Sequence, residues 1–462
     1  MNGLVRTLDV PLAQPPGISL ITSPMRGAQS VLNAFGPLKA KLTAGENAVV
    51  WINADSTGYS EFGPFFKLAR SLGDLHDFTV ILYRWAEWVT SAPTGPKEYS
   101  APVTLRTGTR GTLVIYLASL PGAVAGQMFD ASRKAAAIDA VPTPDLCVTH
   151  HGHNMQSFET NSATGMHRYS AGASNLLGPI GMTEIKWPGV PQLITTQNPW
   201  RDNDDYAKVY QAARLVAISQ PEISIVDSYV KFIDLNKAAN LFRDNVHPSD
   251  TEANSAGAQL VADALIDAYR RAKSGPYTTA AWPLLSGPNL LDNGDFSNWT
   301  AAAPSGWSTQ GAGTTVAKDT DIKYGPAAYS LSLTPSGTVA GQNSNLLKYL
   351  SATEMARIAG KTVNLSILYR RRSTQIAPYL YFSIKDNSGN IRDYITGALI
   401  NCSDEWMWAC IPGIQVINAP ADGWRYLRIF TAFGTGIPAN LDPINIQRVM
   451  LTEGVPPRGL AA

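Results

Sequence analysis

Two short segments of the chain carry side chains that suit nucleophilic attack on a carbonyl carbon. Ser56 lies in the segment 53–58 (NADSTG), and Asp244 and His247 lie three residues apart in the segment 244–248 (DNVHP). A serine hydroxyl is a weak nucleophile until an imidazole accepts its proton, and a carboxylate on the other imidazole nitrogen fixes the tautomer. The residues therefore predict a triad in which Ser56 is the nucleophile, His247 the general base and Asp244 its orienting carboxylate.

Two further segments contain hydrogen-bond donors for the negative oxygen that such an attack creates. Asn154 follows the apolar run 145–150, and a side-chain amide is a suitable donor to an oxyanion. Gly122 and Gly126 follow the apolar run 112–118, and a glycine lets a backbone N–H approach the oxygen closely. Either glycine suits this role. Taken alone, each segment also fits a plain polar turn or a loop beside a helix.

Three clustered histidines, His150, His151 and His153, invite a metal site. Alternation along a strand sends neighbouring side chains to opposite faces, and no cysteine or nearby carboxylate completes a tetrahedral set. We therefore expect no metal and no other cofactor. A direct contact between His153 and the substrate, beside Asn154, is the better interpretation.

Tryptophan and arginine side chains near the strand ends suit a substrate cleft. Trp200 and Arg201 follow the run 192–197, and a proline turn at Asn198-Pro199 precedes them. Trp200 is equally suited to packing, as are Trp85 and Trp88.

Six apolar runs are expected to position these side chains as strands of one sheet. They are residues 48–53, 79–83, 112–118, 145–150, 192–197 and 223–227. Most are too continuous to have a solvated face, which is typical of buried parallel strands. Candidate helices lie between them, near 60–72, 126–139, 167–185, 203–219 and 253–272, so we predict a doubly wound α/β domain. We expect the last helix to begin at a capping box formed by residues 249–252 (SDTE).

The order of these segments resembles the SGNH (GDSL-type) hydrolase family over residues 48–272. The resemblance implies a flavodoxin-like parallel sheet and a serine ester hydrolase without a cofactor. It implies that the Ser56 N–H, Gly126 and Asn154 form the oxyanion hole, because Gly126 fits the family's position before a helix better than Gly122. Two residues depart from the family pattern: Ala54 replaces a glycine, which predicts a shifted loop, and Met155 replaces an aspartate.

The C-terminal part of the chain predicts a second domain. We place an N-terminal arm or cap at 1–46, the catalytic domain at 47–273 and a Pro/Gly/Ser linker at 274–288. A β-sandwich (jelly roll), either carbohydrate-binding-like or used for assembly, follows at 289–462. The segment 289–296 (NLLDNGDF) resembles the opening of jelly-roll carbohydrate-binding modules. Tryptophans suited either to a sugar-binding platform or to the sandwich core are Trp299, Trp307, Trp406, Trp408 and Trp424. A chain cut near Ser274 is expected to cleave a small ester and to lose efficiency on a polymer.

The amino-acid composition narrows the classes of partner that the protein is expected to bind. The 37 Lys and Arg residues nearly cancel the 36 Asp and Glu residues, which argues against nucleic acid or an anionic membrane surface as the main partner. We expect no secretory signal and no membrane insertion, because the sequence shows neither a signal-type apolar start nor a run of roughly 18 apolar residues. The three cysteines are expected to be thiols, with a Cys402–Cys410 bridge as the alternative.

The last strand-like run predicts the biological setting. Residues 446–454 resemble the final strand of sandwich domains in phage tail fibres and tailspikes. By this analogy we expect a homotrimeric virion tail protein, made in the cytoplasm, that removes O-acetyl groups from a host surface polysaccharide. The alternatives are a lipase or thioesterase acting on small acyl esters, and a non-catalytic receptor-binding virion protein with a degenerate site.

Overall fold

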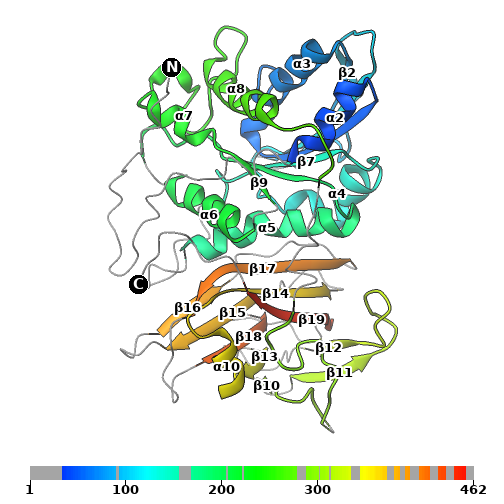
Figure 1. Ribbon diagram of the computed structural model, residues 1–462, viewed down its shortest axis with the longest axis vertical. Coiled ribbons are helices and arrows are strands. Elements are labelled where there is room, and N and C mark those ends of the chain that lie inside the picture. The colour runs from blue at the N-terminus through cyan, green and yellow to red at the C-terminus, as the bar shows by residue number, and fades with distance from the viewer. Residues whose placement is uncertain are drawn as a thin grey trace.

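The chain folds into an α/β domain followed by a β-sandwich, and the two stack along the long axis (Figure 1). The computed structural model describes residues 34–89, 93–155, 168–203, 206–220, 223–277, 288–300, 302–311, 314–334, 344–371, 379–385, 391–395, 405–416, 425–432 and 442–453. None of the helices in these ranges is long and apolar enough to cross a membrane.

Seven strands form the sheet of the first domain. Six pair in parallel: β1 (Ala48–Ala54), β2 (Thr79–Arg84), β6 (Thr112–Ser119), β7 (Leu146–His150), β8 (Gln192–Thr195) and β9 (Ser224–Val226). The seventh, β5 (Val103–Arg106), runs antiparallel to β2 at one edge. Each parallel strand coincides with one of the six apolar runs, which confirms the predicted parallel sheet. A separate two-stranded ribbon, β3 (Trp88–Val89) and β4 (Pro93–Thr94), comes after β2 in the chain.

The order of the strands places β1 between β6 and β7. The full order is β5-β2-β6-β1-β7-β8-β9, and because β2 lies outside β6 it departs from a plain flavodoxin order. The five strands from β6 to β9 nevertheless have the order 2-1-3-4-5 when they are numbered along the chain. The carboxyl ends of β6, β1 and β7 therefore lie side by side, and the segments after these strands contain Gly126, Ser56 and Asn154.

Helices cover both faces of this sheet (Figure 1). One face packs against α2 (Gly36–Ala44), α3 (Pro64–His76) and α8 (Ala256–Arg271), and the other against α4 (Ala131–Lys134), α5 (Arg168–Lys186) and α6 (Tyr206–Ser219). Shorter elements are η1 (Ser56–Gly58), η2 (Gln127–Phe129), η3 (Ala135–Asp139), α7 (Tyr229–Asp234) and η5 (Ala239–Leu241).

Strand β1 shows why two faces form. Val50 and Ile52 point into the core beneath α3 and α8, whereas Trp51 between them points into the opposite core, because side chains alternate along a strand. Helix α2 lies within the segment 1–46, and its Leu38 and Leu42 are buried in the same core as Val50. This helix therefore packs as part of the α/β domain, and the segment 1–46 is not wholly a separate arm or cap.

The predicted capping box before the last helix is wrong. Helix α8 begins at Ala256, and residues 249–252 lie in the preceding loop. The side chain of Asp250 is buried and forms an ion pair with Arg243 at 2.8 Å, so it does not serve as a helix cap. Ser249 still contributes to the helix start, because its Oγ accepts a hydrogen bond from the Gly257 N–H at 2.8 Å.

The C-terminal domain is an antiparallel sandwich, as the alternating runs predict. One sheet has the order β10-β13-β18-β15-β16 and the other β11-β12-β19-β14-β17. The bounds of the first sheet are β10 (Ser308–Gln310), β13 (Ser344–Tyr349), β18 (Arg425–Ala432), β15 (Tyr379–Lys385) and β16 (Ile391–Ile395). Those of the second are β11 (Thr315–Asp319), β12 (Ser330–Thr334), β19 (Ile444–Glu453), β14 (Thr362–Arg371) and β17 (Trp406–Gln415). A short helix, α10 (Ala352–Ile358), carries a complete capping box.

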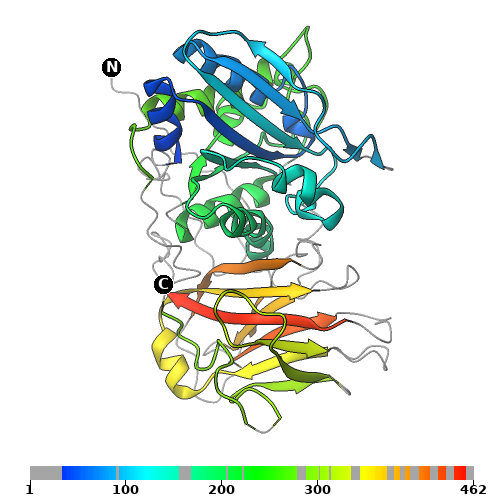
Figure 2. The ribbon, with the colours of Figure 1, turned by 90° about the vertical axis from the view of Figure 1, so that its right-hand side faces the viewer.

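Strand β17 is the part of the sandwich that packs against the α/β domain (Figure 2). Met407 and Ala409 point into the sandwich core, whereas Trp408 and Cys410 point outward and are buried among residues of α5 and α6. A Cβ placed on Gly181 in α5 would lie 2.3 Å from the Trp408 ring, so the indole rests directly on the helix backbone. The sandwich is thus packed against the α/β domain through an apolar cluster around Trp408 and Cys410.

Candidate active site

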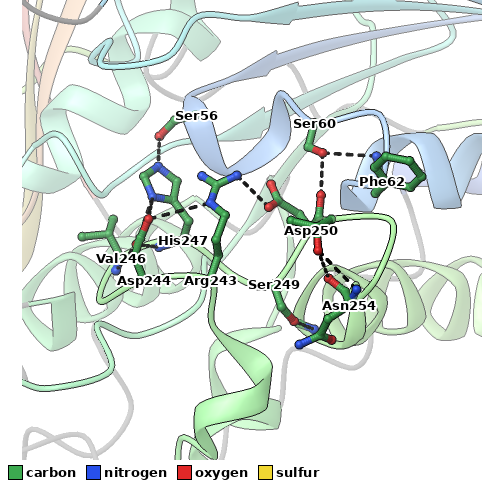
Figure 3. Close-up of polar contacts among 12 residues, drawn as sticks. Ser56, Ser60, Phe62, Arg243, Asp244, Val246, His247, Ser249, Asp250 and Asn254 are labelled. Atoms are coloured by element: carbon green, nitrogen blue, oxygen red, sulfur yellow. Dashed lines mark hydrogen bonds and ion pairs between the residues drawn. The ribbon is translucent and has the colours of Figure 1, made fainter.

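The structure brings Ser56, His247 and Asp244 together at the carboxyl edge of the parallel sheet (Figure 3). Ser56 begins η1 directly after β1, and its Oγ lies 2.8 Å from Nε2 of His247. On the other side of the ring, Nδ1 lies 2.8 Å from Oδ2 of Asp244. If Nδ1 carries the proton and donates to the carboxylate, Nε2 is left to accept the Ser56 proton, which is the arrangement that activates a serine.

Backbone donors hold Asp244 in place. Its Oδ1 accepts hydrogen bonds from the N–H groups of Val246 at 2.8 Å and His247 at 2.7 Å. Partial burial works to raise the pKa of Asp244, but these two N–H groups and the His247 side chain outweigh it and hold the pKa below its usual value. The carboxylate is therefore ionised at neutral pH, as an orienting group requires.

Arg243 links this carboxylate to a second, buried one. Its Nη1 lies 2.8 Å from Oδ1 of Asp250, and its Nε lies 3.8 Å from Oδ2 of Asp244 (Figure 3). The Ser60 hydroxyl, on the segment after η1, donates to the Asp250 carbonyl at 2.7 Å. The loop that carries His247 is thus fastened to the segment that carries Ser56.

A buried polar network lies beneath the nucleophile. Oδ1 of Asp55 accepts hydrogen bonds from the Thr57 N–H at 3.0 Å, the Thr57 hydroxyl at 2.7 Å and the Gln197 amide at 2.8 Å. Burial works to raise the pKa of Asp55, but the neighbouring histidines and Gln197 outweigh it and lower the pKa. Because Asp55 caps η1, this network fixes the turn that presents Ser56.

The predicted oxyanion donors Gly126 and Asn154 lie in the segments that follow β6 and β7, the two strands that flank β1. One amide N–H of Asn154 donates to the Ala123 carbonyl at 2.9 Å, which leaves the other available. Asn53 donates to the Ala125 carbonyl at 2.8 Å, so the loop before Gly126 is tied from both sides. Within the described part of the chain, the N–H groups of Ser56 and Gly126 meet no acceptor, which leaves both available to a ligand.

The three histidines after β7 each have a separate partner. His150 contacts the hydroxyls of Thr57 and Thr195, and Nε2 of His151 lies 3.0 Å from Oδ1 of Asn53. Burial lowers the pKa of His150 to about 3 and the pKa of His151 and of His153 to about 4, so all three are neutral at pH 7. In the ranges that the structure describes, no three His, Cys, Asp or Glu side chains are grouped to hold a metal ion.

The predicted substrate-contacting residues occupy different environments. His153 is 5% exposed, and its Nδ1 accepts a hydrogen bond from the half-buried Trp200 indole at 2.7 Å. Its ring stacks on Tyr206, with ring centroids 4.7 Å apart. Arg201 forms an ion pair with Asp202 at 2.7 Å. The guanidinium of Arg201 also donates to Asn245, next to Asp244, so Arg201 borders the triad loop.

The tryptophans of the predicted sugar platform in the C-terminal domain differ in how far they are buried. Trp307 and Trp408 are buried, Trp299 and Trp406 are half-buried, and Trp424 lies outside the described residues. Cys402 and the residues of the predicted linker from 278 to 287 also lie outside them. Trp307 and Trp408 therefore serve in packing, whereas Trp299 and Trp406 each keep a partly exposed side chain.

Several residues that support the site escape sequence reasoning. Asp55, Thr57 and Gln197 are visible in the sequence only as polar residues at the ends of apolar runs, and Asp250 is expected in a helix cap. The signal that could have found them is the presence of charged and amide side chains next to buried strands, where an unpaired polar group is costly. Two partners of Gln197, the side chains of Asp55 and Thr57, are 140 or more residues away along the chain, so no local pattern identifies them.

Comparisons with known proteins give only distant likenesses. No protein-family model matches the sequence, and no curated protein matches it. Among solved structures, a two-domain esterase (CEX) active on acetylated mannans is 12% identical, with 92% of this chain and 95% of that chain covered and a TM-score of 0.36.

Two others are similar to part of the chain. The C-terminal family 22 carbohydrate-binding module of Clostridium thermocellum Xyn10B is 14% identical over 36% of this chain and 94% of that one, with a TM-score of 0.25. The enzymatically active domain of bacteriophage CBA120 tailspike protein 4 is 15% identical over 36% of this chain and 21% of that one, with a TM-score of 0.23. Likenesses this distant assign no function, so any assignment must rest on the geometry of the site.

Proposed function

We propose that the protein is a serine ester hydrolase of the SGNH type that removes O-acetyl groups from a polysaccharide. The observation that carries the proposal is the chain of contacts from Ser56 Oγ through His247 to Asp244, at 2.8 Å on each side of the ring. Further support is that Ser56, Gly126 and Asn154 come after three adjacent strands, since acyl transfer needs the nucleophile and the oxyanion donors around one carbonyl.

The proposed reaction assigns a step to each of these groups. Ser56 Oγ bonds to the ester carbonyl carbon as Nε2 of His247 takes the hydroxyl proton, and the carbonyl electron pair moves to the oxygen. The Asn154 amide and the N–H groups of Gly126 and Ser56 stabilise that oxygen. Collapse of the intermediate breaks the ester bond, and His247 returns the proton to the departing sugar hydroxyl. A water molecule, deprotonated by His247, then releases acetate and restores Ser56.

Hydrolysis of p-nitrophenyl acetate tests this proposal. We expect Ser56→Ala to lower kcat by about 10⁴-fold or more, because loss of a triad nucleophile has effects of that order. Ser297→Ala is the matched control, because it removes the hydroxyl of an exposed serine in the sandwich that donates to Asp295. Retention of a tenth or more of the wild-type rate by Ser56→Ala would remove Ser56 from the nucleophile role.

A comparison of acyl chain lengths separates the acetylesterase from the alternatives. An acetylesterase prefers the acetyl ester and releases acetate from acetylated polysaccharide. A lipase or thioesterase prefers longer acyl groups, and a non-catalytic receptor-binding protein hydrolyses none of them.

We further propose the setting that the sequence predicts, a homotrimeric phage tail protein that acts on a host surface polysaccharide. Its support is the resemblance of residues 446–454 to tail-fibre strands together with the proposed activity. Sedimentation equilibrium tests the trimer. Acetate release from purified bacterial surface polysaccharide tests the substrate, and a monomer without that activity contradicts the setting.

A further inference from the structure

Trp88, in the catalytic domain, has the one exposed tryptophan side chain among the residues that the structure describes. It is 38% exposed, whereas its neighbour Trp85 is fully buried. A single exposed aromatic residue is common on protein surfaces, so exposure alone carries no inference. The contacts around the Trp88 ring carry the inference.

The Trp88 ring lies next to the segment that carries the nucleophile. The rings of Trp88 and Tyr59 meet edge to face, with centroids 4.8 Å apart. Tyr59 comes directly after η1, three residues after Ser56, which is roughly 6 Å along a 3₁₀ helix. The guanidinium of Arg84 lies 4.7 Å from the centre of the Tyr59 ring. Two aromatic rings and a cation therefore adjoin the segment that carries the nucleophile.

The chain just before Trp88 is firmly anchored. Arg133 makes two hydrogen bonds to the buried Glu87 carboxylate, at 2.7 and 2.8 Å, and the Trp85 indole donates to the same carboxylate at 3.2 Å. The Ala86 N–H also donates to the Glu98 carbonyl at 2.9 Å. These buried contacts fix the backbone that immediately precedes Trp88.

We propose that Trp88 and Tyr59 form a pyranose-binding subsite that holds a sugar ring of the polysaccharide beside the acetyl ester at Ser56. This inference rests on the proposed function. The C–H faces of a pyranose pack against aromatic rings, and its hydroxyls need donors, which the five N–H groups of Arg84 supply. The anchored backbone lowers the conformational cost of binding.

The test compares kcat/KM on two classes of substrate: p-nitrophenyl acetate, and oligosaccharides of O-acetylated mannan and O-acetylated xylan. In Trp88→Ala the ratio of oligosaccharide to aryl acetate efficiency should fall about tenfold, because truncating a central aromatic contact has effects of that order. Trp88→Phe should retain most of the ratio, since a ring remains. Tyr349→Ala, which removes a 61% exposed ring of the sandwich, should behave as the wild type.

An unchanged ratio in Trp88→Ala overturns the subsite while leaving the esterase in place. If the wild type hydrolyses no ester, the proposed function fails, and the subsite is then judged by calorimetric binding of the same oligosaccharides. In that arm Trp88→Ala should weaken binding about tenfold relative to the wild type. Equal affinities, or no binding by the wild type, would reject the subsite.

Discussion

Trp88 and Trp408 lie in different domains and meet opposite surroundings. Trp88 is 38% exposed beside the segment that carries Ser56, whereas Trp408 is 2% exposed and rests on the backbone of Gly181. In the sequence both tryptophans fit either packing or sugar binding. Trp88 thus leaves part of its ring open to a ligand beside the segment of Ser56, whereas Trp408 attaches the sandwich to the α/β domain.

This difference changes the expectation for a shortened chain. A cut near Ser274 removes β17 and exposes the faces of α5 and α6 that now pack on Trp408 and Cys410. Exposure of such a surface favours association and loss of solubility. The sandwich is therefore expected to be needed for a stable catalytic domain, in addition to any role at a polymer.

The largest expected effect is the difference between the two tryptophans in their contribution to the free energy of unfolding. Trp408→Ala should lower the free energy of unfolding by about 3–5 kcal/mol, because it leaves a cavity between the domains. Trp88→Ala should change it by less than about 0.5 kcal/mol, because the ring is exposed. Urea denaturation of both variants measures this. Equal losses would show that the two side chains do not differ as the structure indicates.

The next largest effect concerns the rate of ester hydrolysis at the carboxyl edge of the parallel sheet. Asn154→Ala should lower kcat by about 10²–10³, with a smaller change in KM, because an oxyanion donor acts mainly in the transition state. Steady-state kinetics on an aryl acetate check this, with Asn154→Asp as a variant of the same size that lacks the donor. A normal kcat in either variant would assign Asn154 to the turn that it makes with Ala123.

The two regions also differ in their buried titratable groups, because histidines lie behind the triad and apolar residues fill the interface. His151 has a pKa lowered from 6.5 to about 4 by burial. The unfolded chain therefore binds more protons between these values, and stability is lost as pH falls through 6.5 towards 4. His151 should account for at most about 2 kcal/mol of the loss between pH 7 and pH 5.

His151→Gln tests that contribution, since the Gln amide can replace Nε2 as the donor to Asn53. Urea midpoints at pH 7 and pH 5 should differ less in this variant than in the wild type. The same pH dependence in both proteins would mean that His151 is not buried in its neutral form.

The smallest expected effect tests how closely α5 packs against β17 at the interface between the domains. Alanine in place of glycine inside a helix ordinarily stabilises by about 0.5–1 kcal/mol, but overpacking costs about 1–3 kcal/mol. Because the added Cβ would lie 2.3 Å from the Trp408 ring, Gly181→Ala should be net destabilising by about 1–2 kcal/mol. In a Trp408→Ala background the same change should be neutral or stabilising. A stabilising effect in both backgrounds would contradict the close contact.

Much of the fold and the centre of the site could be predicted from the sequence, because both depend on local patterns. Continuous apolar runs indicate the parallel strands, and the spacing of Asp244 and His247 indicates a pair that meets within one loop. The flanking positions of Gly126 and Asn154 could be inferred because each lies in the segment after a strand.

The remaining features depend on contacts between distant residues. The sequence predicts Asp250 in a helix cap, but its pairing with Arg243 holds it in the loop. The surroundings of Trp408 depend on Gly181, 227 positions earlier in the numbering, and the network of Asp55 depends on Gln197. Periodicity assigns a side chain to a face of its strand, but it does not identify what that face meets.

Active-site labelling tests the central claim most directly. A fluorophosphonate probe forms a bond from serine oxygen to phosphorus and releases fluoride, and it requires a nucleophile activated by a neighbouring base. We predict a single label on Ser56, located by mass spectrometry of the intact chain and its peptides, and labelling at least about 10²-fold slower in His247→Gln. A label on a different residue, or an undiminished rate in His247→Gln, would contradict the assignment of Ser56 and His247 as nucleophile and base.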